Sequence, residues 1–139
     1  MVRFSILLAF AMVSAVAFAA PIPKGIKNKF PDKEAIVGDW LEAPEKARIW
    51  WFKEDGTAGG GDLKSPTRKG LYRMDPMTEP KSLDWSDDNG ATWQLGVYSL
   101  EKDVLIVNIA SKTSDPRPTS LDENNQTHKI SATRKKADK

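Results

Sequence analysis

From residue 35 onward the chain consists of short apolar segments separated by turn-forming residues, and no segment sustains a helical repeat over three turns. Alternation is clearest at 127–134, where His128, Ile130, Ala132 and Arg134 share one face and polar residues occupy the other. A period of two with one solvent-facing side is typical of antiparallel β-strands. The pattern predicts strands at 36–42, 47–53, 71–75, 82–86, 91–100, 104–110, 118–121 and 127–134.

Turn signals recur between these segments about every 8 to 12 residues, a spacing that favours an all-β sandwich or barrel. The expected turns are Glu54-Asp55-Gly56, Gly59-Gly60-Gly61, Asp88-Asn89-Gly90, Glu101-Lys102-Asp103 and Asp115-Pro116. No segment is long enough for a crossover helix, which disfavours a parallel α/β fold. We therefore expect a compact antiparallel up-and-down β-barrel of about eight strands, with a β-sandwich as the alternative.

The N-terminus has the features of a secretory signal peptide. Arg3 precedes an uncharged, largely apolar run at 4–20 that closes on Ala17-Phe18-Ala19, the small-residue pattern of a cleavage site. An uncleaved membrane anchor is the alternative, although the run is slightly short for one. We expect a signal peptide at 1–19, a Pro- and Lys-rich linker at 20–34, one β domain at 35–134 and a basic tail at 135–139. The mature protein would then be periplasmic or extracellular, without membrane attachment.

Composition removes several classes of function. The chain has no cysteine, so an exported domain must rely on a packed core, and cysteine-based metal or redox sites are excluded. Lys and Arg number 21 against 19 Asp and Glu, and neither basic end is dense enough to indicate nucleic-acid binding. We expect a monomer with no cofactor and no metal.

The segment 86–93 resembles the Asp-box of sialidases and other β-propellers at every position of that pattern. The matching residues are Ser86, Asp88, Gly90, Thr92 and Trp93. The resemblance implies a hairpin in which the aspartate accepts hydrogen bonds from turn amides and the tryptophan packs beneath. Gly90 would supply the positive φ that such a turn needs. The chain has room for about two propeller blades, so we expect a structural hairpin and not a sialidase.

Asp84, Ser86 and Asp88 alternate and permit a second interpretation, a calcium-binding loop. The EF-hand pattern, however, requires Gly and Glu where this chain has Asn89 and Leu95. The sequence therefore favours the hairpin over the calcium loop.

Tryptophan supplies the candidate ligand contacts. Trp50 and Trp51 are adjacent on a predicted strand and must point to opposite faces, so at least one lies at a surface or in a lumen. An aromatic side chain there can stack against a sugar or an apolar ligand, whereas core packing is the alternative. His128 is the only histidine and has no catalytic companion in the sequence, so we expect a packed or surface residue.

A distributed set of positions begins with Gly38 and Trp40 and ends with Arg134. It also contains Gly70, Tyr72, Asp75-Pro76, Pro80-Lys81, Asp84, Gly96-Val97-Tyr98, Asp103, Leu105 and Arg117-Pro118. In this set the chain resembles a family of small secreted planctomycete proteins with a lipocalin-like domain of unassigned function. The resemblance implies a barrel in which Trp40 packs under Arg134 and joins the first and last strands. It supplies no catalytic residue.

The expected function is a non-enzymatic, exported binding module for a small apolar ligand or an envelope component. A hydrolase of extracellular or envelope polymers is one alternative, and a structural or interaction protein without a small ligand is another. A lumen larger than about 300 Å³ would favour ligand binding over the last of these.

Overall fold

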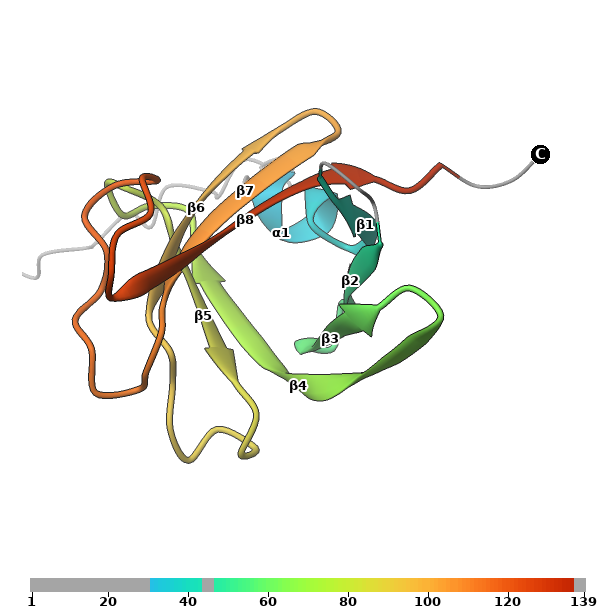
Figure 1. The fold of residues 1–139 in the computed structure, drawn as a ribbon. Helices are drawn as coiled ribbons and strands as arrows, with labels where there is room; N and C mark the ends of the chain where they lie inside the picture. The colour runs from blue at the N-terminus through green and yellow to red at the C-terminus, as the bar shows by residue number, and fades with distance from the viewer. Residues whose placement is uncertain (1–30, 44–46, 137–139) are drawn as a thin grey trace, which may run out of the picture.

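A computed structural model describes residues 31–43 and 47–136, in which eight antiparallel strands form a closed barrel in chain order (Figure 1). The strands are β1 (Gly38–Glu42), β2 (Arg48–Phe52), β3 (Thr57–Asp62), β4 (Ser65–Asp75), β5 (Ser82–Ser86), β6 (Gly96–Glu101), β7 (Val104–Ala110) and β8 (Thr127–Arg134). The expected up-and-down β-barrel is confirmed. The β-sandwich alternative is wrong, because β1 pairs with both β2 and β8 and leaves no open edge. The expected signal peptide at 1–19 lies outside the described residues.

Pairing of the first and last strands is reinforced by a contact between Trp40 and Arg134. The two residues face each other across the β1–β8 pair, and the Arg134 guanidinium carbon lies 4.3 Å from the centre of the indole. The remaining donors of Arg134 reach the carbonyl oxygens of Ala35 and, at 3.0 Å, of Val37. The expected Trp40–Arg134 contact is confirmed, and the same guanidinium also fixes the segment that enters β1.

A short helix, α1 (Pro31–Ala35), lies against the end of the barrel where β1 begins and β8 ends. Asp32 accepts hydrogen bonds from Lys81 Nζ and the Tyr98 hydroxyl, both at 2.8 Å. Burial opposes ionisation of Asp32, but these two bonds outweigh it and lower its pKa. Burial, together with the Asp32 carboxylate, raises the pKa of Tyr98. The expected linker at 20–34 therefore ends in a docked helix that closes this end of the barrel.

The glycine run 59–61 forms part of β3, so the expected turn there is wrong. Gly60 lies opposite Trp50 and Gly59 lies opposite Trp51. A Cβ atom at Gly60 would lie 2.5 Å from Trp50 Cε3, and one at Gly59 would lie 2.1 Å from Trp51 Cζ2. The two indoles thus occupy the space that side chains on β3 would need. The glycines are strand residues because aromatic rings from β2 cover them.

The predicted strand at 118–121 is also wrong, because 111–126 contains no strand. Asn108, fully buried in β7, donates hydrogen bonds to the carbonyls of Ser120 at 3.0 Å and Asp122 at 2.9 Å. Pro118 lacks the amide donor that a ladder position requires. This loop is therefore held to the barrel by a side chain and not by strand pairing.

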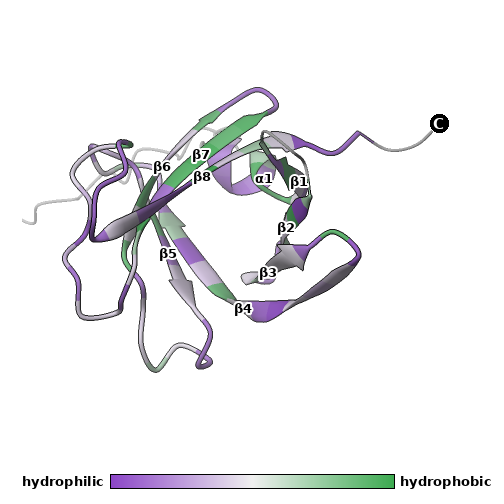
Figure 2. Cartoon of the chain, viewed as in Figure 1, coloured by the Kyte–Doolittle hydropathy of each residue, from purple (hydrophilic) through white to green (hydrophobic). Residues whose placement is uncertain are grey.

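Alternation around the barrel separates a lumen face from an outer face. The register places even-numbered residues of β2, β3, β4 and β8 on the same face as odd-numbered residues of β5 and β7. Figure 2 shows the hydrophobic residues concentrated on β6 and β7, whereas the connecting loops are mostly hydrophilic. β2, β4 and β8 begin, and β7 ends, at the end of the barrel opposite α1.

Candidate functional site: a cavity at the open end of the barrel

A cavity of about 340 Å³ lies in the lumen toward the end opposite α1. Its volume is at the lower end of the range of about 300 to 1,000 Å³ that holds small ligands. Its apolar lining includes Phe52, Leu83, Leu105, Val107, Ile130 and Ala132, which come from four strands. The lumen is therefore not filled by side chains, and its walls suit an apolar body.

Polar side chains in the lining gather at the mouth. They are Arg48, Arg68, Gln94, Ser111 and His128, and no aspartate or glutamate occurs among the described lining residues. The side chains of Arg48 and Arg68 are 47% and 41% exposed, so the mouth reaches solvent. The cavity is apolar within, and its opening carries two arginines, each with one carboxylate nearby: Glu42 at 3.7 Å from Arg48 and Asp87 at 3.2 Å from Arg68.

Each arginine leans over one indole of the wall. The guanidinium carbon of Arg48 lies 5.5 Å from the ring centre of Trp50, and that of Arg68 lies 5.2 Å from the ring centre of Trp85. The two rings meet edge to face, with their centres 6.1 Å apart. Cation–π contact holds the guanidiniums at the mouth while leaving donors at their edges.

The two candidate tryptophans have different positions. Trp50 lines the cavity, is 6% exposed and donates from Nε1 to Glu42 at 2.9 Å. Trp51 lies on the outer face, over Gly59, with the Lys53 ammonium 5.2 Å from its ring centre. The structure therefore places only Trp50 where a ligand in the lumen would touch it.

Trp85 is the second tryptophan in the cavity lining, and its indole nitrogen lacks a partner among the described residues. The residue lines the cavity and is 4% exposed, yet Nε1 donates no hydrogen bond within the described part of the chain. A buried donor without an acceptor is unfavourable by about 1 to 3 kcal/mol.

The segment 86–93 links β5 to the β6 side of the sheet through a compact hydrogen-bonded turn. Asp88 accepts from the Ser86 hydroxyl at 2.7 Å, from the Thr92 amide at 2.8 Å and from the Thr92 hydroxyl. Gly90 has a φ of 88° and donates its amide to the Ser86 hydroxyl at 2.9 Å. Because these bonds hold residues 88–92 in a turn, β6 begins at Gly96 and not at 91. The residues expected to be structural do make the local contacts of a locked turn.

Trp93 lies against this turn from outside the cavity. A Cβ atom at Gly90 would lie 3.6 Å from Trp93 Cζ2, and the Arg73 guanidinium lies 4.2 Å from the Trp93 ring centre. The turn and its tryptophan therefore form part of the outer wall, away from the apolar lining.

Replacement of Asp88 by asparagine is expected to lower the melting temperature at pH 6. Hydrogen bonds from Thr92 and Ser86 lower the pKa of Asp88 to about 2, whereas an unfolded aspartate titrates near pH 4. The stabilisation is thus complete above about pH 4 and is lost as pH falls toward 2. Thermal melts from pH 6 to pH 2 should show the difference between wild type and Asp88→Asn shrinking over this window. Asp87→Asn, which removes the neighbouring exposed carboxylate, should show a much smaller difference at pH 6.

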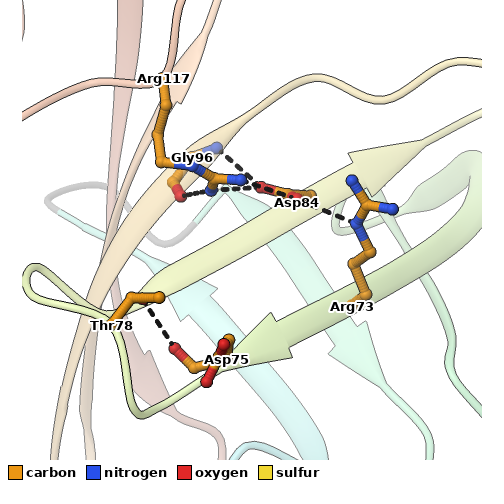
Figure 3. A network of polar contacts seen from close by, with 6 residues as sticks. All are labelled: Arg73, Asp75, Thr78, Asp84, Gly96 and Arg117. Carbon is orange, nitrogen blue, oxygen red and sulfur yellow. Dashed lines mark hydrogen bonds and ion pairs between the residues drawn. The ribbon is translucent and has the colours of Figure 1, made fainter.

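Asp84 lies on the outer face of β5 at the centre of a charged network (Figure 3). Arg117 donates to its two oxygens at 2.5 and 3.1 Å, Arg73 donates at 3.0 Å, and the Gly96 amide donates at 3.2 Å. Arg117 also reaches the Gly96 carbonyl at 2.6 Å. Burial opposes ionisation, but the bonds from Arg117 and Arg73 outweigh it, so the pKa of Asp84 lies below its ordinary value. The network joins β4, β5, β6 and the 111–126 loop.

The candidate calcium-binding residues and His128 make contacts with other residues of the protein. Within residues 31–43 and 47–136, no group of three or more His, Asp or Glu side chains is placed to bind a metal ion. Asp84 and Asp88 of the calcium interpretation are each engaged by separate protein donors. His128 lines the cavity mouth, with Nδ1 3.5 Å from a Glu123 oxygen.

Sequence reasoning missed three of the residues that shape the mouth. Arg48 shares an alternating face with Trp50 and Phe52, and Trp85 shares one with Leu83, so period-two alternation could have placed both. Arg68 gave no such signal, because 65–70 did not have the pattern of a strand.

A scan against protein-family models, a search of curated proteins and a search of solved structures each find no match to this chain. None of the helices in the described residues has the length and apolar character needed to cross a bilayer. The residues that carry the planctomycete resemblance, including Trp40, Arg134, Asp84, Gly96 and Arg117, take part in contacts that hold the barrel together. The family relationship itself stays a prediction.

Proposed function

We propose that the protein is a non-enzymatic binding module that takes a small, largely apolar ligand into the lumen of its barrel. The observation that carries the proposal is the cavity of about 340 Å³ with Phe52, Leu83, Leu105, Val107 and Ile130 in its walls. Apolar surface at the end of a barrel is the usual setting for such ligands, and burying it on binding is favourable by about 25 cal/mol per Å².

Two features support binding over the alternatives. A structural protein without a ligand gains nothing from an unfilled lumen, since the missing contacts weaken the core. A hydrolase built on a carboxylate pair would need acids in its cleft, and the described lining has none. Export from the cytoplasm, expected from residues 1–19, belongs to the same proposal.

Calorimetric titration with 1-octanol tests the proposal in two single-residue variants. Val107 and Ile106 are neighbours on β7, and only Val107 lines the cavity. We expect wild type to bind 1-octanol saturably with a Kd of about 1 mM or below. Val107→Trp should weaken binding by at least about tenfold, because the indole occupies ligand space.

Ile106→Trp is the matched control, since it adds the same side chain on the opposite face of the strand. It should leave the octanol affinity within about twofold of wild type. Circular dichroism and melting of both variants would establish that each is folded. Equal affinity in Val107→Trp and wild type would show that octanol binds elsewhere and would contradict the proposal.

A further inference from the structure

The polarity of the cavity restricts the ligand further than its volume does. Its inner wall is apolar, whereas its charged lining residues, Arg48 and Arg68, both lie at the mouth. A ligand that matches this arrangement has an apolar body and one anionic end.

Arg68 has hydrogen-bonding capacity to spare. Its Nη2 atom is shared between Asp87 and Gln94, each at 3.2 Å. Nε and Nη1 make no hydrogen bond to any described residue. A guanidinium has five donors in a planar fork that matches the two oxygens of a carboxylate. Arg68 can therefore bind a carboxylate without losing its present contacts.

Arg48 also has donors that could bind a ligand carboxylate. Its only ion pair within the described chain is with Glu42, at 3.7 Å from Nε, which is longer than a hydrogen bond. The same Glu42 oxygen already accepts from Trp50 Nε1 at 2.9 Å. Glu42 therefore holds the indole of the wall more closely than it holds the guanidinium.

The strand register brings the two arginines to the same stretch of the mouth. Arg68 lies opposite Gly60, and Gly60 lies opposite Trp50, the residue over which Arg48 leans. Gly60 has no side chain to separate them, and the Trp50 ring covers it. The inner face of β2, β3 and β4 at this level therefore carries Trp50, with Arg48 over its ring and Arg68 two strands away.

Arg68 also lies beside the aromatic wall of the cavity. Its guanidinium carbon is 5.2 Å from the ring centre of Trp85, a residue that lines the cavity. A carboxylate bound at the free edge of Arg68 would therefore lie next to this ring, where the alkyl chain of the ligand could begin.

We infer that the ligand is a small amphiphilic carboxylate, with its apolar body in the lumen and its carboxylate at the mouth, where Arg48 and Arg68 lie. This inference rests on the proposed function, because it assigns the chemistry of the ligand in the same cavity. Carboxylate binding would be charge-assisted, and such bonds are stronger than those of a neutral hydroxyl.

Three probes with one alkyl chain and different end groups test it: octanoate, 1-octanol and octylammonium, titrated calorimetrically into the full chain at neutral pH. We expect octanoate to bind at least about tenfold tighter than 1-octanol, and octylammonium to bind more weakly than either. Octanoate that binds no tighter than 1-octanol would overturn the carboxylate assignment while leaving the lumen proposal intact. Failure of all three probes would contradict both.

Neighbouring positions on β4 offer a matched pair of variants. Arg68→Gln and Lys69→Gln each remove one positive charge, but Lys69 is exposed and only Arg68 lines the cavity. Arg68→Gln should weaken octanoate binding by at least about fivefold, and by a larger factor than it changes 1-octanol binding. Lys69→Gln should change neither. Equal losses of octanoate affinity in the two variants would show that diffuse charge, and not the Arg68 guanidinium, attracts the carboxylate.

Discussion

Substitution of Gly60 by valine is expected to lower the free energy of unfolding by about 3 kcal/mol, the upper end of typical overpacking effects. A Cβ atom there would lie 2.5 Å from Trp50 Cε3 and 2.8 Å from the Ile49 carbonyl oxygen. Trp50 cannot move aside easily, because its indole is buried and its Nε1 is bonded to Glu42. Urea denaturation of the variant measures the loss.

Gly59→Val is the matched control on the adjacent position of β3. Its Cβ would also meet an indole, Trp51, but that ring lies on the outer face and can swing toward solvent. The Cβ would also lie 2.6 Å from the Arg68 carbonyl oxygen, a backbone contact that movement of the ring does not relieve, so we expect a loss of about 1 to 3 kcal/mol. A loss at Gly60 well below the loss at Gly59 would show that Trp50 is not fixed by its surroundings as the structure indicates.

Replacement of Asp84 by alanine is expected to destabilise the barrel by about 2 to 4 kcal/mol. The carboxylate is 5% exposed, and its removal leaves the Gly96 amide and much of Arg117 without an acceptor. The value lies below that of a fully buried pair because Arg73 and Arg117 are 55% and 35% exposed. Chemical denaturation at pH 7 tests it.

The loss at Asp84 should also depend on pH. The folded-state pKa of Asp84 is lowered, so the stabilisation is present above about pH 4 and disappears as pH falls through the folded pKa. Glu101→Ala removes an exposed carboxylate on β6 and should have an effect within about 0.5 kcal/mol at all pH values. A pH-independent loss for Asp84→Ala would mean that packing, and not the ionised carboxylate, supports this region.

Period-two alternation predicted the barrel wherever one face of a strand meets the lumen and the other meets solvent. In β8 the expected face of His128, Ile130, Ala132 and Arg134 is the lumen face of the structure. The failures have a common physical cause. β3 is a strand because Trp50 and Trp51 cover its glycines, and this contact comes from another strand. Single-segment patterns do not contain such information.

The site was predictable only in part for the same reason. Adjacency on a strand showed that Trp50 and Trp51 point to opposite faces, but only the register decides that Trp50 faces the lumen. Arg68 enters the site through β4, whose first six residues have no apolar alternation. Its position depends on pairing with β3, and β3 itself was predicted as a turn.

Nuclear magnetic resonance of the indole N–H groups during titration with 1-octanol tests ligand entry into the lumen most directly, since the chain has five tryptophans in distinct places. Signals of Trp50 and Trp85, which line the cavity, should shift saturably. Those of Trp51 and Trp93, on the outer wall, should remain in place. Shifts confined to Trp51 and Trp93, or no saturable shift at any indole, would contradict a ligand-binding lumen.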